Sequence, residues 1–321
     1  KTTQSNGQFN KLNLVRDNSS QSQIPWSGRG QSYTADEINV VVDAMQNSDP
    51  LTQGKHQNSF EQKFRDFCGA GSAFAVSSCT AALDLAATLC HLGRDDEVII
   101  PAHTYAATAI PFARTGAKIV WADIDPDTRV ISKDTIDKIL TKKTRVIVVV
   151  HLYGLVCDMD PIMALAKKHN ILVVEDAAQS LGAAYKGQQS GSIGDFGCFS
   201  FYPGKNLGAM GDGGAVVTND HDIAERVRCL RNYGSKTKYQ HDEIGINSRL
   251  DEMQAAFLRV KLSALDRWTA QRKEFAKLYT NLLDGYGIGL PSVPDYADPV
   301  WHLFVIRHQS RDSLLEWLKK S

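Results

Sequence analysis

Short apolar runs alternate with helical patterns from residue 73 to residue 217, and this alternation limits the folds that the chain can adopt. Five of the runs have the length and composition of buried strands, at residues 73–76, 97–100, 118–121, 145–150 and 171–174. Helix signals occur between them, at 81–92, after Ser132 and from Asp158 to His169. Strands that alternate with helices through short connections predict an α/β fold with a mostly parallel sheet covered by helices.

Polar residues follow several of these predicted strands. They are the turn Ser78–Thr80, Tyr105 and Asp176. In a parallel sheet, ligands bind beyond the carboxyl ends of the strands. We therefore predict that these three positions converge on one site.

Lys205 occupies a short glycine-flanked loop between two further apolar runs, 198–201 and 215–217. A loop lysine is most often a solvated surface residue. In a desolvated site, however, the pKa of a lysine falls, and its neutral amine can form a Schiff base. The position between two buried runs favours this second interpretation.

Two phosphate-binding motifs are excluded around Lys205. A P-loop needs four residues between its glycines, whereas six separate Gly197 from Gly204, and Asn206 stands where a hydroxyl would hold magnesium. The glycines at 208, 211, 213 and 214 do not have the spacing of a dinucleotide fingerprint, and they lead into a β-branched run. The ordinary interpretation of residues 211–214 is a hairpin turn, which is compatible with a site beside it.

The turn Ser78-Cys79-Thr80 joins a predicted strand to the helix at 81–92. Free backbone N–H groups at such a helix start can bind an anion, although a serine there can also be an ordinary N-cap. Tyr105 follows the next strand, and its ring could cover a planar cofactor or pack as part of an amphipathic helix. The residues alone leave both alternatives open.

Three segments in order resemble the sugar aminotransferase family of the DegT/DnrJ type. They are Glu175–Gln179, Ser200–Gly208 and Gly211–Gly214, and the resemblance runs from about Ile24 to the end of the chain. It implies a pyridoxal-phosphate (PLP) transferase of fold type I, with a mostly parallel, seven-stranded sheet flanked by helices. It also implies a smaller C-terminal α+β domain that is incomplete here, so we expect a truncated chain whose first residue, Lys1, reflects a trimmed start.

The resemblance also implies roles for individual residues. Lys205 would hold the aldehyde of pyridoxal 5′-phosphate and act as the catalytic base, while Asp176 would pair with the pyridine nitrogen. Taken singly, Asp176 would more often be a helix N-cap. The remaining cofactor contacts would come from Gln179 at the phenolic oxygen, Tyr105 on the ring, and Ser78, Cys79, Thr80 and Ser200 around the phosphate.

Two of the family features need comment in this chain. Cys79 stands where the family usually has glycine, which leaves the backbone role of the turn intact. Residues 245–249 match the family motif G-x-N-x-R, so Asn247 would reach the phosphate of the neighbouring subunit in a homodimer with shared active sites. A local alternative is that Asn247 is a helix N-cap.

The implied reaction moves an amino group from L-glutamate to the keto group of a nucleotide-linked keto-(6-deoxy)hexose. Residues 202–206, around Lys205, resemble the branch of the family that makes 3-amino sugars slightly more than the 4-amino branch, within amino-sugar, lipopolysaccharide or polysaccharide biosynthesis. Three alternatives stay open. A PLP-dependent sugar dehydratase would have histidine in place of Lys205, a PLP-binding protein would not turn over, and a nicotinamide-dependent oxidoreductase would need the missing dinucleotide fingerprint.

Composition limits partners and location. Lys+Arg and Asp+Glu are both 36, so the formal net charge is zero, which argues against nucleic acid or a membrane surface as the main partner. The six cysteines form no C-x-x-C, which favours a reduced cytoplasmic chain and no metal site. The most apolar stretch, Val146 to Val156, is too short for a transmembrane helix, and we identify no signal peptide.

We expect three regions along the chain. Residues 1–23 are polar and predict a flexible tail or swapped arm, residues 24–250 form the large cofactor-binding domain, and residues 251–321 form connecting helices and the start of a small domain. A capping box at residues 34–37 predicts a first helix, and Gly69 a helix end. Near the end of the chain we predict a strand at 300–306 and a helix at 311–320.

Overall fold

The computed structural model describes residues 33–237 and 239–320, so the predicted tail at 1–23 lies outside the described residues. A seven-stranded sheet forms the centre, in the order β1-β9-β8-β5-β4-β2-β3. Its strands are β1 (Ser72–Val76), β2 (Glu97–Pro101), β3 (Lys118–Ala122), β4 (Thr144–Val150), β5 (Leu172–Asp176), β8 (Phe196–Ser200) and β9 (Gly214–Thr218). Each apolar run that the sequence predicts as a strand between residues 73 and 217 overlaps one of them, to within one residue at the ends 171 and 201.

The sheet is mostly parallel, as predicted. Strands β8, β5, β4, β2 and β3 run in one direction, and β9 runs antiparallel to both of its neighbours, β8 and β1. Val150 and Asp176, the last residues of β4 and β5, lie side by side in register with Cys198 of β8. The carboxyl ends of the parallel strands therefore form one edge of the sheet.

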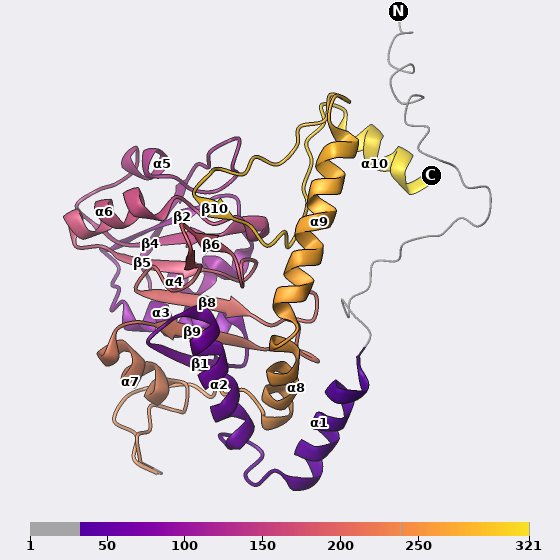
Figure 1. Ribbon diagram of the computed structural model, residues 1–321. Helices are drawn as coiled ribbons and strands as arrows, with labels where there is room; N and C mark the ends of the chain where they lie inside the picture. Colours follow the sequence, from indigo (N-terminus) through magenta and orange to yellow (C-terminus); the bar gives the residue numbers. More distant parts are fainter. Residues whose placement is uncertain (1–32, 238, 321) are drawn as a thin grey trace, which may run out of the picture.

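Helices cover both faces of this sheet (Figure 1). One face packs against α3 (Cys79–Leu89), α4 (Ile110–Arg114) and α7 (His221–Leu230) around Phe74, Val148, Val174 and Cys198. The other face packs against α2 (Lys55–Cys68), α5 (Lys133–Asp137), α6 (Met159–His169) and α8 (Glu252–Leu262). Alternate residues of each strand enter the two cores, which is the period-two pattern of a buried strand.

Local signals in the sequence account for several helix ends. Helix α1 (Ala35–Asn47) begins with the predicted capping box between Thr34 and Glu37. Helix α2 ends at Gly69, which adopts the left-handed conformation that the sequence predicts. Asp158 holds the N-cap position of α6, but its carboxylate makes no capping bond and accepts one from the Tyr185 hydroxyl instead.

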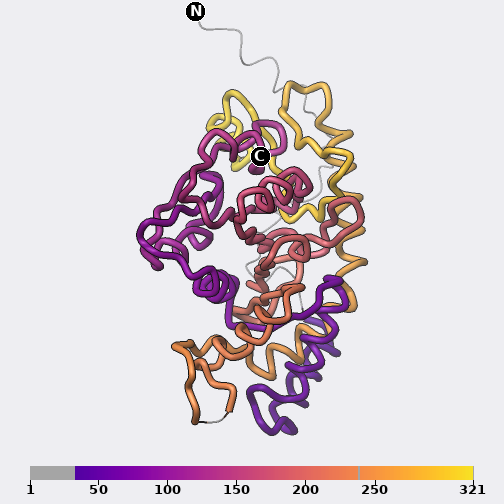
Figure 2. The backbone as a smooth tube through the Cα atoms, turned by 90° about the vertical axis from the view of Figure 1, so that its left-hand side faces the viewer, coloured from indigo at the N-terminus to yellow at the C-terminus, as the bar shows by residue number. Residues whose placement is uncertain are grey.

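The chain after residue 250 is helical, then irregular. Helix α9 (Leu265–Leu283) is the long helix along one side of the molecule, with α10 (Arg311–Lys320) beyond its far end (Figure 1). The tube in Figure 2 shows α1 and α2, in indigo, close to the orange segment near residue 250, and α8 contacts both helices. Among the described residues, no helix is both long enough and apolar enough to span a membrane.

The predicted strand at 300–306 is wrong. These residues have no regular structure, although the backbone amides of Val300 and Leu303 donate to the carbonyls of Gly154 and Tyr153. A strand requires a neighbouring strand for its remaining backbone groups, and the described part of the chain provides none there. The nearby small sheet instead joins β10 (Ala297–Asp298) to the hairpin β6 (Ala184–Tyr185) and β7 (Gln188–Gln189), which the sequence analysis does not predict.

Candidate active site

A cavity of about 570 Å³ opens at the carboxyl edge of the sheet. Its walls come from the first turn of α3, from residues 104–108, from the end of β5 and from the loop after β8. All the predicted site residues except Asn247 line it, namely Ser78, Cys79, Thr80, Tyr105, Asp176, Gln179, Ser200 and Lys205. The prediction that the Ser78–Thr80 turn, Tyr105 and Asp176 lie around one cavity is therefore confirmed.

Asp176 is the last residue of β5 and faces α3, on the same side of the strand as Val174. It is 6% exposed, and its carboxylate accepts hydrogen bonds from the Thr108 hydroxyl (2.7 Å, at Oδ2) and the Ala178 amide (3.2 Å, at Oδ1). Burial raises its pKa, although both bonds and the nearby Lys205 oppose that shift. The helix N-cap interpretation of Asp176 is wrong, because residues 177–183 form turns and no helix begins there.

Lys205 lies on the loop that joins β8 to β9. The loop closes on itself through bonds from the Ala209 amide to the Phe201 carbonyl and from the Lys205 amide to the Tyr202 carbonyl. Gly208 makes this closure possible, because a Cβ there would lie 2.3 Å from the Pro203 carbonyl oxygen. Burial lowers the pKa of Lys205, and the Asp176 carboxylate opposes this shift only partly, so the neutral amine is favoured relative to a solvated lysine.

The residue after Lys205 anchors the loop. The Asn206 side chain is buried, donates to the Val300 carbonyl (3.2 Å) and contacts Nδ1 of His302 (3.1 Å). The irregular segment that replaces the predicted strand at 300–306 therefore contacts the loop that carries the lysine.

The first turn of α3 has the structure of an anion site. Ser78 is the N-cap, and its hydroxyl accepts a bond from the Ala81 amide. Cys79 and Thr80 line the cavity, and their amides precede any acceptor within the helix. Gly214 of β9 packs directly against this turn, since a Cβ there would lie 2.4 Å from the Ser78 carbonyl carbon.

Cys79, which stands where the family usually has glycine, does not disturb the backbone of the turn. Its side chain packs partly against the core cluster of α3, and burial raises the pKa of its thiol well above the ordinary value. The side chain is therefore neutral and behaves as a small apolar group. The anion would meet the backbone of this turn, which the substitution leaves unchanged.

The remaining predicted contacts lie on the other walls. Gln179 accepts a bond from the Tyr153 amide (2.7 Å), and Ser200 accepts one from the Tyr202 amide (3.3 Å). Tyr105 is 78% exposed and is the N-cap residue of a short 3-10 helix, η2 (Ala106–Thr108). An exposed ring on the cavity wall has free area to cover a planar ligand, so the packing alternative for Tyr105 is wrong.

Asn247 lies outside the cavity. It is exposed and pairs through its backbone with Asn232. The helix N-cap alternative is wrong, because α8 begins at Glu252 and Asp251 holds the N-cap position. The predicted contact of Asn247 with a neighbouring subunit stays a prediction.

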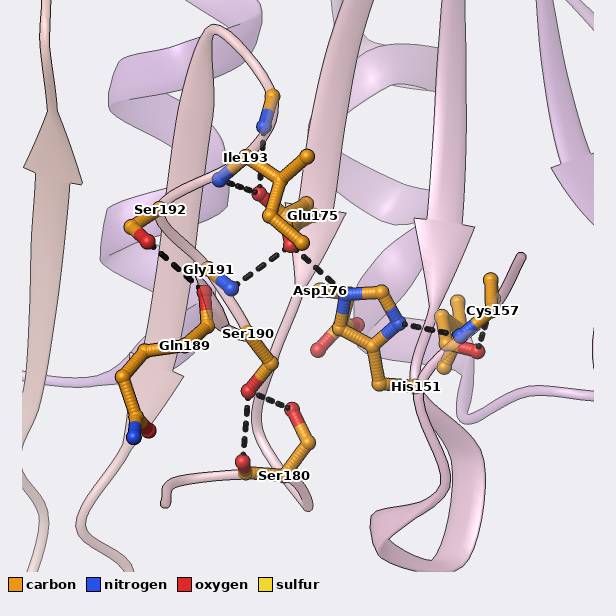
Figure 3. A network of polar contacts seen from close by, with 12 residues as sticks. His151, Cys157, Glu175, Asp176, Ser180, Gln189, Ser190, Gly191, Ser192 and Ile193 are labelled. Atoms are coloured by element: carbon orange, nitrogen blue, oxygen red, sulfur yellow. Dashed lines mark hydrogen bonds and ion pairs between the residues drawn. The ribbon is translucent and has the colours of Figure 1, made fainter. Parts of the chain in front are cut away.

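Glu175, beside Asp176 in the chain, anchors a buried polar network on the opposite face of β5 (Figure 3). One oxygen accepts from the Ile193 and Gly194 amides, and the other accepts from the Gly191 amide and contacts Nε2 of His151 at 2.8 Å. His151 accepts from the Cys157 amide at Nδ1, which leaves its proton on Nε2, directed at the carboxylate. The network therefore holds the end of β5 in place from the face opposite to the cavity.

Several cavity residues were not found by sequence reasoning. Thr108 contacts Asp176, Thr104 contacts Thr108, and Asp212 lies on the wall near Lys205. No motif marks Thr104 or Thr108, which lie in a run of small residues. The contact between Thr108 and Asp176 joins positions 68 residues apart, so only the fold reveals it.

These groups fit pyridoxal phosphate. A neutral lysine can hold an aldehyde, a buried carboxylate can hold a protonated ring nitrogen, and a helix start can hold a phosphate. The close approach of Gly214 keeps that helix start in place, where any side chain would displace it. Such a cavity at the carboxyl edge of such a sheet defines an aminotransferase of the PLP-dependent, fold-type-I class.

Comparison with known proteins gives the particular family. The chain belongs to the DegT/DnrJ/EryC1/StrS aminotransferase family, whose model matches residues 32–321. A dTDP-3-amino-3,4,6-trideoxy-alpha-D-glucose transaminase of Streptomyces venezuelae is 45% identical over 279 residues, which are 87% of this chain and 74% of that protein. A dTDP-3-amino-3,6-dideoxy-alpha-D-galactopyranose transaminase of Aneurinibacillus thermoaerophilus is 44% identical. The matched region is 88% of this chain and 78% of that protein.

One relative carries a different kind of name. The pleiotropic regulatory protein of Geobacillus stearothermophilus is 43% identical over 287 residues, which are 88% of this chain and 77% of that protein. Among solved structures, S. venezuelae DesV has a TM-score of 0.86 at 44% identity and covers 89% of this chain and 77% of its own. The PLP-form of Spr1654 from Streptococcus pneumoniae has a TM-score of 0.85 at 28% identity, with 92% and 82% covered.

Proposed function

We propose that this protein transfers an amino group from L-glutamate to the 3-keto group of a nucleotide-linked keto-(6-deoxy)hexose. The observation that carries the proposal is the position of Lys205 and Asp176 in one cavity, together with the free amides of the α3 start. The reaction would serve amino-sugar and polysaccharide biosynthesis in the cytoplasm, and the six free cysteines are consistent with a reducing compartment.

Each residue has a distinct task in this proposal. Lys205 would hold the aldehyde of pyridoxal phosphate with its amine, and the same amine, when free, would serve as the base for a proton at the donor carbon. Asp176 holds the ring nitrogen in its protonated form, and the bound ring then supplies an electron sink. The amides of Cys79 and Thr80, with Ser78 and Ser200, bind the phosphate.

Two further contacts orient the ring. Gln179 would bond the phenolic oxygen through its amide nitrogen, because its amide oxygen already accepts from the Tyr153 amide. The exposed side chain of Tyr105 would be available to cover the ring. Both side chains line the cavity, which supports this arrangement.

The choice of a 3-keto acceptor rests on relatives. Both transaminases compared above are named for 3-amino sugars, at 45% and 44% identity. Their names favour carbon 3 over carbon 4, in agreement with the sequence context of Lys205. For the oligomer we propose a homodimer, in which the exposed Asn247 of each subunit contacts the phosphate in the other.

A regulatory protein without turnover is the second candidate. The name of the Geobacillus stearothermophilus relative favours it. Lys205 and Asp176 would hold the cofactor in either case, and the two transaminases compared above, at 45% and 44% identity, favour turnover. Lys205 argues against the dehydratase alternative, where histidine would replace it.

An absorption experiment tests the proposal. Protein reconstituted with PLP should show the visible band of lysine-bound cofactor, and L-glutamate should remove it. Adding a nucleotide-linked 3-keto-6-deoxyhexose should then restore the band, whereas the 4-keto isomer should not. A band that glutamate leaves unchanged would reject glutamate as donor, and restoration by the 4-keto isomer alone would reject the 3-keto assignment.

A further inference from the structure

Two threonines form a polar chain that ends on Asp176. The Thr104 and Thr108 hydroxyl oxygens are 2.7 Å apart, and Thr108 Oγ1 lies 2.7 Å from Asp176 Oδ2. Thr108 is buried, with 1% of its surface exposed, while Thr104 lines the cavity. A buried hydroxyl at this distance from a carboxylate is a strong, charge-assisted contact.

The charge of Asp176 sets the direction of this chain. An ionised carboxylate has no proton to donate, so Thr108 must donate its single hydroxyl hydrogen to Oδ2. Thr108 can then only accept from Thr104. Both hydroxyl dipoles therefore point toward Asp176, and each bond polarises the next in the direction that stabilises the negative charge.

The contact also fixes the orientation of the carboxylate. The Ala178 amide holds Oδ1 and Thr108 holds Oδ2, so the Asp176 side chain is constrained at both oxygens. The Thr108 amide in turn bonds the Tyr105 carbonyl at 3.0 Å, within the same 3-10 turn. One short segment thus links the carboxylate proposed for the ring nitrogen to the aromatic residue proposed for the ring face.

We propose that Thr108 is a positioning residue, which holds the Asp176 carboxylate ionised and oriented for the ring nitrogen of the cofactor, with Thr104 as its second donor. The proposal rests on the proposed function, because it assumes that Asp176 meets that nitrogen. Other titratable groups interact electrostatically with Asp176, and they stay unchanged in the test: Lys205, His151, Cys79 and Cys198.

The test compares the pH dependence of bound PLP in four proteins: wild type, Thr108→Val, Thr108→Ser and Thr104→Val. The valine variant keeps the shape of Thr108 and removes its hydroxyl, whereas the serine variant keeps the hydroxyl. The absorption of the bound cofactor changes on acidification, and we expect the midpoint pH of this change to be about one to two units higher in Thr108→Val than in wild type. Such a shift is equivalent to one hydrogen bond to a charged group. Thr108→Ser should match wild type, and Thr104→Val should move less in the same direction.

The dissociation constant of PLP, measured by fluorescence, gives a second readout that needs no turnover. We expect it to rise about tenfold in Thr108→Val and to stay at the wild-type value in Thr108→Ser. If Thr108→Val does not fold, Thr104→Val still decides, because a transition at the wild-type pH would overturn the chain of donors.

The outcomes separate this proposal from the proposed function. A wild-type band with an unshifted Thr108→Val transition would overturn the role of Thr108 alone. Equal shifts in the valine and serine variants would overturn it too, since they would reveal a packing effect. A wild-type protein that gives no band with PLP would overturn both proposals.

Discussion

Glu175 and Asp176 are consecutive residues of β5, yet their carboxylates lie on opposite faces of the sheet. Glu175 is enclosed by backbone amides and His151, whereas Asp176 faces the cavity. The alternation of a strand thus assigns one carboxylate to the scaffold and the other to the site. Substitutions at these two positions should accordingly have different effects, the first on stability and the second on chemistry.

Replacing Glu175 with Gln should destabilise the protein by about 3–5 kcal/mol, because a donor amide would face groups that already donate. Urea unfolding would measure the loss. Glu225→Gln, on the surface of α7, is the matched control and should change stability by less than about 0.5 kcal/mol. Equal stabilities for the two variants would contradict the structural role of Glu175.

Replacing Asp176 with Asn should weaken cofactor binding but leave some cofactor bound, and it should slow the reaction with L-glutamate by about 10²–10³-fold, the usual loss when one electrostatic stabiliser is removed. Stopped-flow absorbance would follow that single half-reaction. A rate within twofold of wild type would show that the ring nitrogen does not depend on Asp176.

Replacing Lys205 with Ala should abolish covalent capture of PLP. Borohydride reduction followed by mass spectrometry would detect the attached cofactor in wild type and its absence in the variant. Lys168→Ala, at the exposed end of α6, removes a lysine far from the cavity and should behave as wild type. Attachment that survives in Lys205→Ala would assign the amine to another residue.

The rate of PLP capture should depend on pH through the Lys205 amine. Only the unprotonated amine attacks an aldehyde, so the rate rises as pH passes the pKa of the lysine. Burial lowers that pKa, so the midpoint should lie below the ordinary value of about 10.4. A pH series of capture rates would test this, and a midpoint at or above that of a free lysine side chain would be inconsistent with a desolvated site.

Mixing two inactive variants should restore activity if Asn247 serves the neighbouring subunit. A hybrid dimer of Lys205→Ala and Asn247→Ala chains contains one site with both native residues. Partial activity would therefore appear on mixing, at up to about a quarter of the wild-type level for random exchange with both parents inactive. Confirmed hybrids without activity would refute the shared site.

Local signals in the sequence predict much of this fold. Some features depend only on neighbours within a few residues, namely the capping box of Thr34, the left-handed Gly69 and the apolar strands. Such features can be predicted from the sequence without knowledge of the fold. Motif positions likewise predict the lysine, the carboxylate and the anion site. Contacts across the chain could not be predicted, because Thr108–Asp176 and Asn206–Val300 join positions 68 and 94 apart.

The errors have the same origin. Residues 300–306 have the apolar composition of a strand, but whether such a run forms a strand depends on a partner elsewhere in the chain. The hairpin β6–β7 was missed because each of its strands has two residues, too few for a periodic pattern. Asn247 likewise is a residue type that suits a helix N-cap, but the first residue of α8, Glu252, lies five residues further on.

The anchoring of Asn206 to Val300 and His302 has a consequence for the order of events during synthesis. Asn206, in the loop that carries Lys205, is synthesised 94 residues before its hydrogen-bond partner Val300. At ordinary translation rates this interval lasts about 5–20 s. The seven strands of the central sheet end at Thr218, so all of them emerge before Val300, while the loop still lacks its final hydrogen bonds. Cofactor capture by a fully formed site is therefore a late step, and a nascent chain stalled before residue 300 should be a poor acceptor of PLP.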